Sequence, residues 1–94
     1  MKKFLSLHFG FEEPTPEIMK ASEAWFESIS DQQVEQGVFS GGREISKSGT
    51  MDLPWNMESV TGYNILKAES LDAAEKLAQN PIIASIRIYE VRSM

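Results

Sequence analysis

Cysteine is absent from the 94 residues of this chain. Its absence excludes disulfide bonds, thiolate catalysis and zinc or iron–sulfur sites with cysteine ligands. Histidine is scarce as well, since His8 is the single one. A zinc site is disfavoured because no second histidine exists and carboxylates alone prefer harder ions. We therefore predict no metal site and no cofactor.

Clusters of basic residues and long hydrophobic runs are also missing. The net charge is −5, and an acidic protein repels phosphate groups, so we predict neither nucleic-acid binding nor binding to anionic membranes. The opening Met1-Lys2-Lys3 is typical of a signal peptide, but the apolar run after it breaks at His8 and Gly10. It is too short for a signal-peptide core or a membrane span, so a cytoplasmic location is expected.

What remains is the composition of an ordinary globular protein, with 41% hydrophobic and 24% charged residues. The length fits one domain covering residues 1–94. A monomer of this size buries only about two-thirds of its unfolded surface, which favours help from a partner subunit.

Hydrophobic periodicity predicts six elements in the order β-α-β-β-α-β. Thr15 and Ser70 are suitable N-caps, and Asn80-Pro81 ends the second helix. Right-handed crossovers then give an α+β, ferredoxin-like fold, a four-stranded antiparallel sheet with both helices on one face. The predicted strands are 3–9, 38–46 (interrupted by Gly41-Gly42), 60–68 and 83–92, and the predicted helices are 16–36 and 71–79.

Both faces of this sheet are partly apolar, although two helices can cover only one. We predict that a second copy covers the other face, forming a homodimer through paired sheets. Polar side chains on that face either line a semi-open cavity or lie at the wet margins of the sheet. The residues expected to face the helices are Leu5, Leu7, Ile65, Ile86 and Ile88. Those expected to face away are Phe4, Leu66, Tyr89 and Val91, with His8, Asn64 and Arg87.

Four stretches of sequence resemble the YCII-related family, in its DGPF-domain branch, within the dimeric α+β barrel superfamily. These stretches are MKKFLSLHFG with PTPEIMKASEAWFESI (1–10 and 14–29), DLPW (52–55), GYNI with AESLDAA (62–65 and 68–74) and IRIYEV (86–91). The resemblance implies a ferredoxin-like protomer, a dimeric α+β barrel and a cleft near residues 52–55. Some relatives are suspected enzymes with a His–Asp pair whose histidine lies on the first helix. Residues 16–36 contain no histidine, and Leu53 and Trp55 replace the Gly and Phe of the motif, so only Asp52 and Pro54 match it.

Asp52 and His8 are the candidate catalytic residues. A carboxylate over a cleft can act as an acid, a base or a ligand anchor, and histidine titrates near neutral pH. The structural alternatives are that Asp52 accepts backbone hydrogen bonds within its own turn and that His8 is a packed strand residue.

Five further side chains are candidate ligand-binding residues. Trp55 follows Pro54 in a loop, where an aromatic ring often covers a pocket or fills a dimer seam. An arginine can hold an anionic ligand, or pair with a surface carboxylate instead. The five are Trp55, Arg87, Tyr89, Asn64 and Arg43.

Three functions fit these patterns. The first is a homodimer that binds a small molecule in a cleft without chemistry of its own. The second is a cofactor-independent enzyme in which His8 and Asp52 move protons on a small organic substrate. The third is a protein-interaction module that uses an acidic stripe to bind a basic partner. The alternative is that this stripe is a solvated helix face without a partner. The stripe consists of Glu23, Glu27, Asp31 and Glu35.

Overall fold

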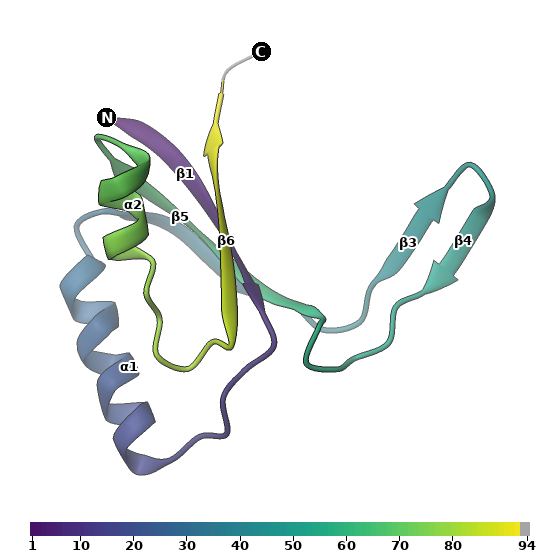
Figure 1. The fold of residues 1–94 in the computed structure, drawn as a ribbon, viewed down its shortest axis with the longest axis horizontal. Coiled ribbons are helices and arrows are strands. Elements are labelled where there is room, and N and C mark those ends of the chain that lie inside the picture. The colour runs from purple at the N-terminus through teal and green to yellow at the C-terminus, as the bar shows by residue number, and fades with distance from the viewer. Residues whose placement is uncertain (93–94) are drawn as a thin grey trace.

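The structure, a computed structural model, describes residues 1–92; residues 93 and 94 of the predicted domain lie outside the described residues. A four-stranded antiparallel sheet has the order β2-β5-β1-β6, and β3 and β4 form a separate hairpin (Figure 1). The elements are β1 (Lys2–Phe9), α1 (Pro16–Ile29), β2 (Gln33–Val38), β3 (Arg43–Ser46), β4 (Gly49–Asp52), β5 (Val60–Ala68), α2 (Leu71–Leu77) and β6 (Ser85–Val91).

The ferredoxin-like prediction is confirmed. Strand β1 lies in the sheet between β5 and β6 and pairs antiparallel with both. Both predicted caps are in place, because Thr15 Oγ1 accepts a hydrogen bond from the Ile18 N–H at 3.1 Å and Ser70 Oγ accepts one from the Ala73 N–H at 3.2 Å. These bonds satisfy donors that a helix start otherwise leaves free.

Helix α1 ends at Ile29, so the predicted extension to residue 36 is wrong. Residues Gln33–Val38 form β2 and bond to β5 instead. The polar sequence after Ile29 offers no apolar stripe to bury, whereas an edge strand satisfies its backbone groups without one. The predicted acidic stripe is shortened as a result, since Asp31 and Glu35 lie outside the helix.

The predicted strand 38–46 is two strands. Strand β2 ends at Val38 and β3 begins at Arg43, after the Gly41-Gly42 pair. Residues 43–52, which we call the arm, form the β3–β4 hairpin, although residues 47–56 were predicted to be a loop. The turn requires Gly49, whose φ of +131° is unfavourable for other residues. In Figure 1 the arm projects away from the sheet and the helices.

The predicted orientation of β1 and β5 is wrong. Phe4 and Leu66 are fully buried beneath the helices, whereas Leu5, Leu7 and Ile65 point to the other side. The alternation was identified correctly, but both sets of side chains are apolar, so periodicity alone does not reveal which set the helices cover. On β6 the prediction holds, because Ile86 and Ile88 pack against the core.

We call the uncovered side of the sheet the open face. The strand register places its members together, since Leu5 lies opposite both Ile65 and Tyr89, and Leu7 lies opposite Tyr63 and Arg87. Its apolar side chains are half-buried or exposed. They are Leu5, Leu7, Phe9, Tyr63, Ile65, Tyr89 and Val91.

The helix-covered core combines apolar and polar residues. Trp25, predicted to be core, is 9% exposed, and its indole N–H donates to the Leu77 carbonyl at 2.8 Å. Beside the apolar cluster, His8 Nε2 donates to Asn64 Oδ1 at 3.0 Å, and Asn64 Nδ2 donates to Gln33 Oε1 at 3.2 Å. These bonds offset the cost of burying His8 and Asn64.

Burial lowers the pKa of His8 below its ordinary value of 6.5, and the hydrogen bond to Asn64 only partly opposes this effect. Because the unfolded chain binds the proton more tightly, stability is complete above pH 6.5 and falls as the pH drops from there toward the pKa of the folded state. If the pKa of His8 lies one unit lower in the folded state, the folded state loses about 1.4 kcal/mol of stability at acid pH.

We expect His8→Gln to reduce the loss of unfolding free energy between pH 8 and pH 5, measured by urea titration. An equal loss in both proteins would contradict this expectation.

Candidate functional site

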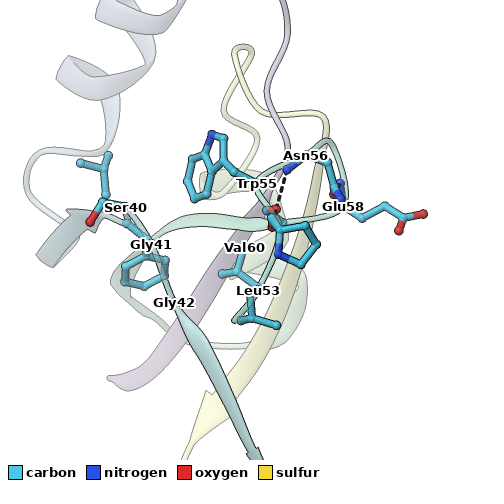
Figure 2. Close-up of a pocket in the computed structure, with 12 residues that line it drawn as sticks. Ser40, Gly41, Gly42, Leu53, Trp55, Asn56, Glu58 and Val60 are labelled. Atoms are coloured by element: carbon cyan, nitrogen blue, oxygen red, sulfur yellow. Dashed lines mark hydrogen bonds between the residues drawn. The ribbon is translucent and has the colours of Figure 1, made fainter. Parts of the chain in front are cut away.

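A cavity of about 670 Å³ lies at the base of the arm. One wall is the segment between β2 and β3, and the other is the segment between β4 and β5 (Figure 2). Sequence segments that join strands are free of sheet pairing and are common places for binding residues. The cavity is lined by Val38, Phe39, Ser40, Gly41, Gly42, Leu53, Pro54, Trp55, Asn56, Glu58, Ser59 and Val60.

Internal hydrogen bonds hold the second wall in shape. Ser59 Oγ donates to the Pro54 carbonyl and accepts from the Asn56 N–H, both at 2.8 Å. Asn56 Oδ1 accepts from the Glu58 N–H, also at 2.8 Å. These polar side chains are therefore engaged in building the loop, as serine and asparagine often are in turns.

Gly10 attaches this wall to the end of β1. Its N–H donates to the Ser59 carbonyl at 3.0 Å, and its carbonyl accepts from Thr61 Oγ1 at 2.9 Å. A Cβ at position 10 would lie 2.5 Å from the Met57 carbonyl oxygen, and the φ of +64° also favours glycine. The position of the wall relative to the sheet thus depends on a residue without a side chain.

The lining is mainly apolar and aromatic. Phe39 belongs to the first wall and Trp55 to the second, and Trp55 is 52% exposed. Among the lining residues Glu58 is the one charged side chain, and in Figure 2 it extends away from the first wall. A cavity with two aromatic rings and no inward charge is suited to a flat, uncharged molecule.

Phe39 connects the cavity to the open face. Its ring stacks on that of Tyr63, with centroids 5.5 Å apart and planes 15° from parallel. The Tyr63 hydroxyl donates to Glu35 Oε2, and this bond raises the pKa of Tyr63 above its ordinary value of 10.0. The cavity wall and the open face are therefore joined by one aromatic pair.

The two candidate catalytic residues have separate partners. Asp52 Oδ1 accepts from Arg43 Nε at 2.9 Å on the arm, where both side chains are largely exposed. His8 is buried under the helices and bonded to Asn64. A base and the group that orients it must lie within hydrogen-bond reach. The structure does not pair His8 with Asp52, and the acid–base role stays a prediction.

The other candidates are also dispersed. Of the five ligand-binding candidates, Trp55 is the one that lines the cavity. Arg43 lies on the arm, where it is paired with Asp52. Arg87 lies over the Phe9 ring, 4.8 Å from its centroid, and shares the open face with Tyr89. Asn64, expected on that face together with His8, lies instead in the core, because β5 has the opposite orientation.

Sequence reasoning missed Phe39 as a lining residue. It was assigned to the predicted strand 38–46, in which alternation alone would have set the direction of its side chain. The Gly41-Gly42 pair was interpreted as an interruption within one strand, whereas in the structure it lies in a connection between two strands.

Within residues 1–92, no group of three or more metal-ligating side chains lies together. Over the same residues, neither helix has the length and apolar content needed to cross a membrane.

No protein-family model matches the chain, and no curated protein matches it in sequence. Its structure is similar to that of 5-chloro-2-hydroxyhydroquinone dehydrochlorinase from Burkholderia phenoliruptrix AC1100, which was solved in complex with 2,5-dihydroxybenzoquinone. The TM-score is 0.57 at 15% sequence identity, over 96% of this chain and 93% of that one. At this identity the similarity establishes the fold.

Proposed function

We propose that the chain forms a homodimer that binds a small, uncharged aromatic molecule in the cavity at the base of the arm. The observation that carries this proposal is that each wall of the cavity contributes an aromatic residue, Phe39 in one wall and Trp55 in the other. Rings on two sides stack on a planar ligand, and stacking is worth about 1–3 kcal/mol per ring system.

The size of the cavity supports the same ligand class. Sites for small molecules typically measure about 300–1,000 Å³, and this one measures about 670 Å³. The structural neighbour binds a molecule built on one planar six-membered ring, 2,5-dihydroxybenzoquinone. A ring of that size leaves room in the cavity for substituents or for a second ring.

The charge around the cavity narrows the class of ligand further. The one charged lining residue, Glu58, is negative, and so is the whole chain, at −5. The nearby Arg43 is bonded to Asp52. The negative charge would therefore repel an anionic ligand, and no cation among the lining residues would hold it. These charges favour a neutral ligand.

The open face supports the dimer. It carries seven large apolar side chains, and soluble monomers rarely expose a contiguous apolar surface of this kind. A second copy related by a two-fold axis presents the same surface and buries both. Assembly as a dimeric α+β barrel is part of this proposal, and so is membership of the YCII-related family that the sequence resembles.

Titration calorimetry with 2-naphthol and 2-naphthoate tests the ligand class, because the two probes share one ring system and differ in charge. We expect binding of 2-naphthol and at least about tenfold weaker binding of the anion. Trp55→Ala removes one stacking surface and is expected to weaken 2-naphthol binding by about 10- to 100-fold.

Phe26→Ala is the matched control, since Phe26 is an aromatic residue 38% exposed on α1, outside the cavity. It is expected to leave the affinity unchanged. Equal affinity for both probes, or no effect of Trp55→Ala, would argue against the proposed site.

A further inference from the structure

Within residues 1–92, the two strands of the arm pair only with each other. Every residue of β3 and β4 is exposed, and Ile45 is 81% and Met51 57% exposed. A two-stranded hairpin alone is at best marginally stable in water. Its defined strand pairing and its exposed apolar side chains are explained if the arm packs against another surface.

The charge of the arm indicates what that surface is. Its two basic residues, Arg43 and Lys47, balance its two acidic residues, Glu44 and Asp52, whereas the whole chain carries −5. Two acidic copies repel one another, but a neutral segment approaches a second copy without that cost. Helix α1 carries Glu23 and Glu27, so its surface would repel a second acidic copy.

The position of the arm indicates where it packs. The arm begins and ends at the cavity walls, next to Gly42 and Leu53, and Leu53 N–H donates to the Gly42 carbonyl at 3.0 Å. The ring of Phe39, a lining residue, stacks on that of Tyr63, a residue of the open face, so the cavity and the open face lie next to each other. A copy that covers the open face therefore lies beside the cavity as well, and two-fold symmetry makes the exchange reciprocal.

We propose that each protomer inserts its arm against the cavity of its partner, so that every binding site is built from two chains. This inference rests on the proposed function, because it requires both the dimer and the cavity. Ile45 shares one face of the hairpin with Thr50, whereas Met51 lies on the other face with Glu44. The Ile45 side chain closes the open side of the partner's cavity over Trp55 and excludes water from the ligand. The isolated protomer thus holds an incomplete site.

Mixed dimers test the shared site directly. One chain carries Ile45→Glu, which places a charge on the cavity-facing side of the arm and leaves the cavity lining intact. The other carries Trp55→Ala, which disrupts the cavity and leaves the arm intact. Each homodimer is expected to bind 2-naphthol at least about tenfold more weakly than the unmodified protein, and the mixed dimer is expected to regain one site of full affinity. Full affinity in the arm-variant homodimer, or no recovery in the mixed dimer, would overturn the inference.

A measurement without ligand separates this inference from the proposed function. Because the chain contains no cysteine, each variant carries a single thiol. We expect a short bismaleimide to join Ile45→Cys chains to Leu53→Cys chains, and not to Lys20→Cys chains, whose thiol lies on α1. A dimer that does not cross-link at these positions refutes the shared arm alone. A monomeric protein refutes the arm and the proposed dimer together.

Discussion

Phe4→Ala is expected to lower the free energy of unfolding by about 3–5 kcal/mol. Phe4 is fully buried beneath the helices, and its cluster includes Ala68 and Ala74. Small neighbours cannot fill the space that a phenyl ring leaves, so the cavity cost adds to the lost burial. For a domain with a total stability of about 5–15 kcal/mol this is a large fraction. Urea unfolding at a fixed protein concentration measures the change.

Phe11→Ala is the matched control. Phe11 is 45% exposed in the connection after β1, so the same substitution is expected to cost about 1 kcal/mol. If Phe11→Ala were the more damaging of the two, the orientation of β1 in this structure would be wrong.

Tyr89→Glu is expected to dissociate the dimer, raising the dissociation constant by at least about 100-fold. Tyr89 lies on the open face opposite Leu5, at the position where two sheets would meet. An unpaired carboxylate costs several kcal/mol to bury, and two-fold symmetry places two of them in one interface. Sedimentation velocity over a concentration series measures the shift, and the fold is expected to persist because Tyr89 is 51% exposed in the protomer.

Met19→Glu supplies the control for charge. Met19 is 46% exposed on α1, the acidic side of the chain, and outside the open face. It adds the same charge without entering the proposed interface, so the dimer is expected to survive. Dissociation by both variants would point to general repulsion rather than to the open face.

The order of elements was predictable because local signals agreed with one another. Strand Val60–Ala68 was identified at its observed bounds, and the Thr15 and Ser70 caps begin the two helices as expected. These features depend on neighbours in sequence: alternation, a side-chain oxygen near free N–H groups, and a proline in the first turn.

The covered side of the sheet was not predictable, for a physical reason. Leu5 with Ile65 and Phe4 with Leu66 form two rows of similar hydrophobicity, so sequence offers no preference between them. The choice depends on packing with α1 and α2, which is a property of the folded chain. Leu66, which was expected to face the second copy, is fully buried in the core, so Leu66→Asp would place a charge there and unfold the protein.

The candidate site was predictable only in part. Trp55 was identified because an aromatic residue after a proline in a loop has few structural uses. Strand β4 of the arm was missed because residues 49–52 are few and contain no alternating apolar row, although their backbone pairs with β3. His8, Asn64 and Asp52 were selected for their chemistry, and the structure shows that their hydrogen bonds are made with residues other than those of the cavity.

Sedimentation equilibrium of the unmodified chain tests the central claim most directly. If a second copy covers the open face, the measured mass is twice the 10.6 kDa of one chain across the concentration range. A mass of 10.6 kDa at every concentration would contradict the dimer, and with it the shared binding site.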